Sequence, residues 1–269
     1  MGYLCLLAVL YGVLEGITEW LPVSSTGHLI LLNRLLPKTL DAAFFSLFEV
    51  VVQLGAMLAV LVLFFPRLCP FCHKKGERAP VLRLWALVAV AVMPAALIGA
   101  LLGDRIEALL FSPLVVGVAL IVYGVVFLLL SRVGRYPSVK RAEEMTLRHA
   151  LFIGCFQVLA LVPGTSRSGA TITGALCLGI SRPAASEFSF FLGVPTMLGA
   201  GALSVLRFVR AGGVLSPENA LFLAVGTLVS FLVSLISIKF LLGFVKRHTF
   251  APFGVYRILL GAAVLLFLV

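Results

Sequence analysis

Six long apolar segments constrain the fold of this chain more than any other feature of its sequence. They run over residues 44–65, 84–102, 113–131, 187–209, 220–243 and 253–269. At a rise of ~1.5 Å per residue, an α-helix of this length crosses the hydrocarbon core of a bilayer, which is about 30 Å thick. The strands of a transmembrane β-barrel are instead ~10 residues long and alternate between apolar and polar positions. The sequence therefore predicts an all-α polytopic membrane protein with six transmembrane helices.

The composition excludes the soluble alternatives. Of 269 residues, 61% are hydrophobic and only 12% are charged, whereas soluble proteins carry about 25% charged residues. The net charge is +10, from 21 Lys and Arg against 11 Asp and Glu. In a membrane protein this excess indicates basic cytoplasmic loops and contact with anionic membrane lipids, and we expect no nucleic-acid partner. The five scattered cysteines do not indicate a disulfide framework.

Two further apolar stretches are each interrupted by residues that disfavour a continuous helix. Segments 1–21 and 23–33 flank one break, and segments 147–162 and 170–181 flank the other. Non-helical backbone at membrane depth persists only where it is buried in protein or lines a cavity. We therefore interpret each pair as a re-entrant helical hairpin, and we expect the two hairpins to meet near the membrane midplane. The two breaks read Pro22-Val-Ser-Ser-Thr-Gly27 and Pro163-Gly-Thr-Ser-Arg-Ser-Gly169.

The similar character of the breaks indicates an internal duplication. Downstream of them, Glu49-x3-Gln53-Leu-Gly55 is echoed by Glu187-x3-Phe191-Leu-Gly193. We assign one repeat to residues 1–131 and the other to residues 147–269, joined by a basic linker over 132–146, within a single membrane domain of residues 1–269. Because each repeat makes three full crossings, which is an odd number, the second repeat is expected to be inverted relative to the first.

The distribution of basic residues predicts the orientation in the membrane. Fourteen Lys and Arg residues fall on one predicted side and five on the other. The positive-inside rule then places the loop over 66–83 and the central linker in the cytoplasm, and both termini on the outer face. The larger set is Arg67, Lys74, Lys75, Arg78, Arg83, Arg132, Arg135, Lys140, Arg141, Arg148, Arg182, Lys239, Lys246 and Arg247. The smaller set is Arg34, Lys38, Arg105, Arg207 and Arg210, while Arg167 and Arg257 lie within segments.

The first break carries acidic, hydroxyl and imidazole side chains. Glu15 and Glu19 are four residues apart and therefore share one face of a helix. Two carboxylates at membrane depth are costly unless a cation or a shared proton relieves their repulsion, and a hydrated helix end at the interface is the structural alternative. Ser24, Ser25 and His28 follow. The imidazole is close enough in sequence to activate a hydroxyl or to protonate a leaving group.

The second break has the features of a phosphate site. Its glycines allow backbone amides to converge on an anion, and the helix that opens after it presents unpaired N–H groups. Arg167 adds a planar, permanently charged fork; a kinked helix with this arginine snorkelling to the interface is the structural alternative. The break is not a P-loop, because the lysine of that motif is missing. We predict phosphate contacts from Gly164, Thr165, Ser166, Arg167, Ser168 and Thr171, with Ser24 contributing from the first break.

Together the two breaks indicate phosphoryl chemistry on a membrane-embedded substrate. An acidic pair beside a phosphate cradle implies a bridging divalent cation, for which Glu15 and Glu19 are the candidate ligands. We predict Ser25 as the nucleophile, with His28 as its acid–base partner and Ser24 in support. Glu19 and Arg167 are the other predicted catalytic residues. Direct attack by His28 and attack by an activated water are the alternatives.

These motifs resemble those of the undecaprenyl-pyrophosphate phosphatases of the bacitracin-resistance type, from end to end. The matching residues are Glu15-x3-Glu19, Leu21-Pro-Val-Ser-Ser-Thr-Gly-His28, Phe48-Glu-Val-Val-Val-Gln-Leu-Gly55, Pro163-Gly-Thr-Ser-Arg-Ser-Gly-Ala-Thr171 and Ser186-Glu-Phe-Ser-Phe190. The resemblance implies hydrolysis of undecaprenyl diphosphate, a polyprenyl diphosphate lipid, to undecaprenyl phosphate. This reaction recycles the lipid carrier of peptidoglycan synthesis and confers bacitracin resistance. The resemblance also implies Mg²⁺ or Ca²⁺ as cofactor, an interlocked re-entrant fold, a homodimer, and a site open to the outer face of the bacterial inner membrane.

Two other functions share parts of this pattern. Acid-phosphatase-like lipid phosphatases have a His six residues after their Arg and an Asp four residues later, but Thr173 and Cys177 stand at those positions. A transporter or flippase for the polyprenyl phosphate carrier would use the same inverted repeat and anion site, but it has no evident need for Ser25 or His28. The stretch Cys69-Pro-Phe-Cys72-His73 lies outside all these motifs. It formally matches a haem-attachment pattern, and a chance match or an adventitious metal site explains it better.

Overall fold

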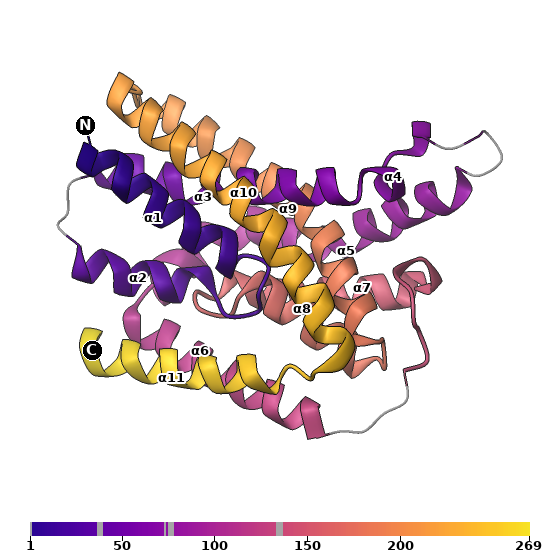
Figure 1. The fold of residues 1–269 in the computed structure, drawn as a ribbon. Coiled ribbons are helices and arrows are strands. Elements are labelled where there is room, and N and C mark those ends of the chain that lie inside the picture. The colour runs from indigo at the N-terminus through magenta and orange to yellow at the C-terminus, as the bar shows by residue number, and fades with distance from the viewer. Residues whose placement is uncertain (1, 37–39, 73, 75–77, 133–136) are drawn as a thin grey trace.

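The computed structural model describes residues 2–36, 40–72, 74, 78–132 and 137–269. Within these ranges every regular secondary-structure element longer than one residue is a helix, as Figure 1 shows. This finding confirms the predicted all-α class. The α-helices are α1 (Gly2–Thr18), α2 (Ser25–Leu35), α3 (Ala42–Leu63), α4 (Phe65–Leu68), α5 (Ala79–Leu110), α6 (Pro113–Arg132), α7 (Leu147–Val158), α8 (Arg167–Cys177), α9 (Arg182–Arg210), α10 (Pro217–Arg247) and α11 (Ala251–Leu268). Short 3-10 turns are η1 (Pro70–Cys72), η3 (Ala142–Glu144) and η4 (Leu159–Leu161).

Six of the described helices are long and apolar enough to cross a membrane, namely α3, α5, α6, α9, α10 and α11. Their most apolar windows have mean hydropathies of 1.6 to 2.8. Large apolar side chains point outward along them, such as Leu109, Ile236 and Leu266, which are 80%, 71% and 79% exposed. Apolar surface on this scale is stable against lipid rather than water. The chain is a multi-pass membrane protein, and the six predicted spans are confirmed.

The two interrupted stretches fold into pairs of short helices, but their boundaries correct the prediction. The turn between α1 and α2 covers residues 19–24, and the segment between α7 and α8 consists of η4 and residues 162–166. The last three residues of each predicted break, 25–27 and 167–169, instead form the first turn of α2 and of α8. Short polar residues suit the start of a helix as well as a loop. The N–H groups of the first turn have no partner within the helix, and short polar side chains can bind them.

The long helices surround α8. α1 packs along α10, α7 along α5, and α6 along α11, while α3 contacts both α9 and α10. In Figure 1, α8 lies at the centre of the molecule, beside the turn that joins α1 to α2. Both termini lie at one end of the molecule, whereas α4 and α7 lie toward the other. This arrangement agrees with the two sides that the basic residues predict.

Glycine permits a close helix approach where α6 crosses α11. A Cβ atom added to Gly124 would lie 2.7 Å from the carbonyl oxygen of Gly254, and one added to Gly254 would lie 2.7 Å from that of Gly124. Gly117 and Gly261 meet in the same way, at 3.2 and 2.7 Å. Such contacts between backbones are typical of membrane helices, whose association depends on close packing. They fix the position of α11 beside the two breaks.

Candidate active site

Each break ends in a serine with an unfavourable backbone conformation. Ser24 has φ 72° and ψ 104°, and Ser166 has φ 71° and ψ 123°. Among the described residues these are the only two, apart from glycines, with positive φ. Such a conformation costs an L-residue about 1–3 kcal/mol, and strain of this kind clusters at functional sites. Because each serine directly precedes a helix, its conformation sets the direction in which the first turn of α2 or α8 points.

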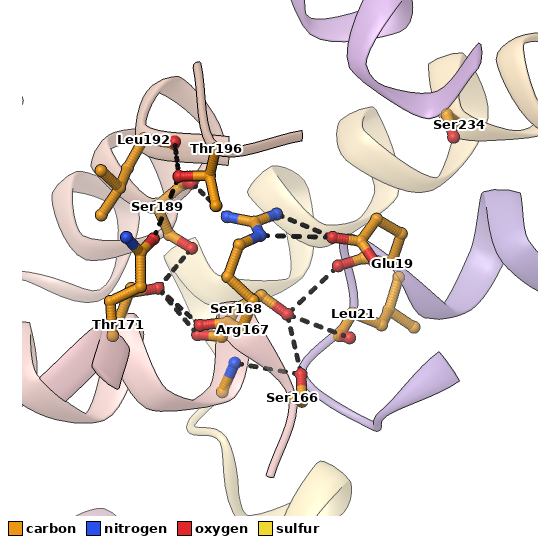
Figure 2. Close-up of polar contacts among 12 residues, drawn as sticks. Glu19, Leu21, Ser166, Arg167, Ser168, Thr171, Ser189, Leu192, Thr196 and Ser234 are labelled. Atoms are coloured by element: carbon orange, nitrogen blue, oxygen red, sulfur yellow. Dashed lines mark hydrogen bonds and ion pairs between the residues drawn. The ribbon is translucent and has the colours of Figure 1, made fainter. Parts of the chain in front are cut away.

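Arg167, the first residue of α8, joins the second break to the first. Figure 2 shows its guanidinium beside the Glu19 carboxylate: Nη2 and Nε donate to Oε1 at 3.0 and 3.3 Å. Nη1 donates to the backbone oxygen of Ser189 at 2.7 Å, and Cζ lies 5.5 Å from the ring centroid of Trp20. The two charged side chains are only 11% and 9% exposed. A buried fork of this kind holds the guanidinium in one orientation and brings the two breaks into contact.

Gly193 of α9 lies directly against the same guanidinium. A Cβ atom at this position would be 2.8 Å from Nη2 of Arg167, and 2.9 Å from Cζ and Nη1. Contacts under 3.0 Å force something to move. The absence of a side chain on Gly193 is therefore part of how the fold accommodates Arg167.

Hydroxyl groups of α8 support the backbone around Arg167. The Ser168 Oγ lies 3.2 Å from the backbone oxygen of Glu19 and donates to it. Thr171 Oγ1 is 3.0 Å from the Arg167 carbonyl oxygen and 2.7 Å from the hydroxyl of Ser189. Ser168 and Thr171 are each 1% exposed. Figure 2 shows both hydroxyls directed at protein groups, so each has a structural role.

Ser166 closes the start of the same helix. Its Oγ accepts a hydrogen bond from the Gly169 N–H at 3.2 Å, and it lies 3.2 Å from the hydroxyl of Ser168. This is the usual way in which a serine satisfies a free amide at a helix N-terminus. One of the amides that the sequence offered to an anion is therefore already paired within the protein.

Glu15 is the least satisfied charged group of the first break. It lies one helical turn before Glu19, is 1% exposed, and neither of its carboxylate oxygens has a hydrogen-bond partner among the described residues. It lies in the electrostatic field of Glu19, Glu49 and Arg167. A buried carboxylate without a hydrogen-bond donor is costly, so this position requires a proton or a cation.

The donor set at Glu15 and Glu19 fits a hard divalent cation. Mg²⁺ and Ca²⁺ prefer oxygen ligands, and Mg²⁺ is commonly held by one or two carboxylates together with substrate phosphates. Over the described part of the chain, no three His, Cys, Asp or Glu side chains gather as a complete metal site. Two carboxylates that depend on a phosphate for the remaining ligands are consistent with that finding.

His28 binds groups other than Ser25 in this structure. Its Nδ1 lies 2.7 Å from the backbone oxygen of Ser24, and its Nε2 lies 2.6 Å from the hydroxyl of Tyr256. Because a carbonyl oxygen only accepts, Nδ1 carries the proton, and in the neutral ring Nε2 accepts from Tyr256. The two rings also stack, with centroids 5.5 Å apart and an interplanar angle of 14°. The Ser24 carbonyl therefore fixes the tautomer of His28, and Tyr256 helps to fix the orientation of its ring.

The two serines before His28 differ in accessibility. Ser25, at the first position of α2, is partly exposed. The side chain of Ser24 is 1% exposed, and its hydroxyl has no partner among the described residues. Ser25 therefore has the more accessible hydroxyl, and its role as nucleophile stays a prediction.

Arg257 of α11 is fully buried and holds both breaks through carbonyl oxygens. Nη1 donates to the oxygen of Pro22 at 3.2 Å, and Nη2 donates to those of Gly164 and Thr165, both at 2.9 Å. Nε lies 3.5 Å from the oxygen of Leu120 on α6. Loss of the guanidinium would leave these buried carbonyls unpaired. Two of the predicted phosphate contacts, Gly164 and Thr165, thus direct their carbonyl groups at Arg257.

Glu187, the counterpart of Glu49 in the sequence echo, belongs to a separate cluster. Its Oε2 accepts from Arg67 Nη2 at 3.0 Å, and Arg67 also pairs with Glu143 of η3. Burial alone would raise the pKa of Glu143, but the hydrogen bond from Arg67 and the charges of Arg67 and Arg141 outweigh it and hold this pKa below its ordinary value. This cluster ties α4 to α9.

Three residues that touch the predicted site were given no role in the sequence analysis: Ser189 and Gly193, which fall within quoted motifs, and Tyr256, which does not. Tyr256 and His28 are 228 positions apart, and no local pattern pairs residues at such a distance. Arg257 did carry a signal, because an arginine within an apolar segment is by default a candidate functional residue.

Comparison with known proteins decides the family. Residues 8–263 match the family model described as "Bacitracin resistance protein BacA". The chain belongs to this family. The match covers both breaks and all six membrane-spanning helices apart from the last residues of α11, so the predicted resemblance is confirmed.

Curated relatives agree over the same length. The chain is 49% identical over 260 residues to a protein of Clostridioides difficile named undecaprenyl-diphosphatase 1, covering 96% of this chain and 94% of that one. It is 46% identical over 259 residues to the undecaprenyl-diphosphatase of Enterococcus faecalis, covering 95% and 94%. The undecaprenyl-diphosphatase of Acetivibrio thermocellus is 45% identical over 264 residues, covering 97% and 96%.

Proposed function

We propose that this protein is an undecaprenyl-diphosphate phosphatase, which releases phosphate from the lipid diphosphate and so returns the carrier to peptidoglycan synthesis. The names of relatives that are 45–49% identical over nearly the whole chain support this function. The observation that carries it is the buried contact between Arg167 and Glu19, beside the unpaired carboxylate of Glu15. An anion clamp next to two acidic groups at membrane depth suits a diphosphate better than any uncharged lipid.

The residues of the site divide the work of phosphoryl transfer. Arg167 offsets negative charge on the transferring phosphoryl group, while Ser168 and Thr171 keep its backbone in place. Ser25 attacks the terminal phosphorus and breaks the bond to the bridging oxygen, which leaves with the lipid monophosphate. Its hydroxyl proton passes to a base, for which His28 is our candidate. Water then releases phosphate from the serine.

A divalent cation, held by Glu15 and Glu19, would neutralise charge on the diphosphate. Glu19 also orients the Arg167 guanidinium through two hydrogen bonds. Its carboxylate therefore links the proposed cation ligands to the arginine that binds phosphate. The carrier-transport alternative would use the same clamp, but the names of the relatives favour the phosphatase.

We also propose that the fold is an inverted repeat with two re-entrant hairpins. A constant offset of 142 residues relates Gly12 to Gly154, Glu15 to Gln157, and Ser24 to Ser166. The first pair supports this strongly: a Cβ at Gly12 would meet Gly226 of α10 at 2.5 Å, and one at Gly154 would meet Ala91 of α5 at 2.5 Å. The packing of α1 on α10 thus repeats in that of α7 on α5.

The basic residues support a cytoplasmic location for the loop over 66–83 and for the linker. Both termini and the opening of the site then face the outside of the bacterial cell membrane. This orientation suits a substrate whose diphosphate is exposed on the outer face.

A metal-dependent phosphate-release assay tests the function. Purified protein in detergent should release phosphate from undecaprenyl diphosphate. Glu19→Gln should both lower the rate and raise the Mg²⁺ concentration needed for half the maximal rate. Glu218→Gln, an exposed position in the first turn of α10, is the matched control and should match wild type. No phosphate release by the wild-type protein would overturn the function, whereas unchanged metal dependence in Glu19→Gln would make this residue a general base rather than a ligand.

A further inference from the structure

A tight turn after α4 carries two free cysteines that belong to none of the active-site motifs. Cys69 follows α4, Cys72 ends η1, and the N–H of Cys72 donates to the carbonyl oxygen of Cys69 at 3.2 Å. Side chains at positions i and i+3 of a 3-10 turn lie one above the other. This geometry places the two thiols on the same side of the turn. His73, the next residue in the sequence pattern, lies outside the described residues.

The base of this turn is held rigidly, while its tip is exposed. The N–H of Cys69 donates to Phe65 at 2.9 Å, and Trp85 Nε1 of α5 donates to the carbonyl oxygen of Leu68 at 2.7 Å. Leu68 itself is 5% exposed. Cys72, by contrast, is exposed. The fold therefore presents an accessible dithiol from a fixed support.

The two thiols differ in character. The hydrogen bond from Cys72 lowers the pKa of Cys69 by more than its partial burial raises it, and the backbone N–H groups of Phe71 and Cys72 lower it further. The same contact with Cys69 raises the pKa of Cys72. An attacking thiol needs thiolate character, whereas a resolving thiol reacts second. This asymmetry assigns the first role to Cys69 and the second to Cys72.

The surroundings are cationic. Lys74 is exposed, and the guanidinium of Arg78 lies 5.9 Å from the ring centroid of Phe71. Phe71 stands between the two cysteines and is 82% exposed. Positive charge beside a thiol favours its thiolate and attracts anionic reactants.

We propose that Cys69 and Cys72 form a thiol–disulfide exchange site that reacts with a small anionic disulfide. The Cys69 thiolate attacks one sulfur of the co-reactant, forms a mixed disulfide and expels the other half as a thiolate. Cys72 then loses its proton and attacks the Cys69 sulfur, which forms the Cys69–Cys72 bond and expels the second half. The pair gives up two electrons and two protons, and the co-reactant disulfide becomes two thiols.

The short loop closed by a Cys69–Cys72 disulfide indicates what such a bond can do. A bond between residues 69 and 72 closes a loop of only four residues, so it removes little freedom from the unfolded chain and joins no two helices. Its value therefore lies in reversible reaction rather than in stabilising the fold.

Oxidation in defined glutathione buffers tests the proposal. The full-length protein in detergent is equilibrated with a chelator and a series of ratios of reduced to oxidised glutathione, then alkylated, digested and analysed by mass spectrometry. In the wild type, Cys69 and Cys72 should lose their labels together in one two-electron transition. Cys5, Cys155 and Cys177 are internal references and should stay labelled at that ratio.

Two variants test the assigned order. Cys72→Ser should retain a stable glutathione mixed disulfide on Cys69, because the resolving thiol is missing. Cys69→Ser should show severalfold less mixed disulfide on Cys72. The proposal fails if both thiols stay fully alkylated in oxidised glutathione, or if they oxidise no more readily than Cys155, which is also exposed. Greater modification of Cys72 than of Cys69 would overturn the assignment of the attacking thiol.

Discussion

Adding a single methyl group at Gly193 should disable the anion clamp without damaging the fold. The Cβ of Gly193→Ala would lie 2.8 Å from Nη2 of Arg167, whereas ordinary Cβ contacts begin at 3.4 Å. The guanidinium must therefore retreat by at least 0.6 Å, which is 3.4 minus 2.8 Å. It cannot do so freely, because Glu19 holds it at 3.0 Å and Ser189 at 2.7 Å.

This displacement of the Arg167 guanidinium should remove about one charge-assisted hydrogen bond to the transferring phosphoryl group in the transition state. Such a bond contributes about 1.5–3 kcal/mol, which corresponds to a loss of about 10- to 150-fold in kcat/KM. An independent guide agrees, since a misplacement of ~1 Å in a catalytic group can reduce the rate about 100-fold. We expect the loss to appear mainly in kcat, because the clamp acts on charge that develops during transfer.

Gly199→Ala provides the matched control. Gly199 lies on the same helix, α9, and nothing lies within 4 Å of an added Cβ. Replacing glycine with alanine inside a helix favours the helix by about 1 kcal/mol in both variants, so neither should unfold. The assay is steady-state phosphate release, with thermal unfolding followed in parallel. If Gly193→Ala keeps kcat/KM within about twofold of Gly199→Ala, then the guanidinium is not held as described and the reasoning is wrong.

Three further predictions concern the reacting groups. Arg167→Lys keeps the charge but loses the fork, so turnover should fall about 100-fold, and near-normal turnover would exclude the clamp. Ser25→Ala should fall to background in the same assay while Ser24→Ala keeps measurable turnover. A Ser25→Ala rate within about tenfold of wild type, a loss of only ~1.4 kcal/mol, would make water the attacking group. Tyr256→Phe keeps the ring stacked on His28 but removes one hydrogen bond, so kcat should fall about three- to tenfold; an unchanged kcat and pH–rate profile would separate Tyr256 from the chemistry.

The membrane spans could be predicted because the length of an apolar run is a local property. Their ends could not. The span predicted over 84–102 continues as α5 from Ala79 to Leu110, through Asp104 and Arg105. A helix can extend beyond the hydrocarbon region into water. Its backbone hydrogen bonds continue there, although the hydropathy of the sequence falls. The interruptions were equally visible, yet the sequence did not reveal that each ends in one strained serine, because φ depends on how the next helix is docked.

The same distinction between local and long-range information applies to the active site. Residues within one break, such as Glu15, Glu19 and Ser25, could be proposed from spacing and chemistry alone. The contact between Glu19 and Arg167 followed only from the assumption that the two breaks meet, since they are 148 positions apart. The steric role of Gly193 depends on the exact depth at which α9 packs, which no residue pattern encodes.

The two strained serines have a consequence for how such a site could arise. Ser24 and Ser166 share nearly the same φ, and each is followed by the first residue of a helix. That residue is Ser25 in one half and Arg167 in the other. If the halves descend from one duplicated gene, a single ancestral backbone geometry was copied and then specialised, with a hydroxyl retained in one copy and a cation in the other. An ancestor with one kind of half would have needed two chains to assemble the same pair, and fusion would have freed each copy to diverge.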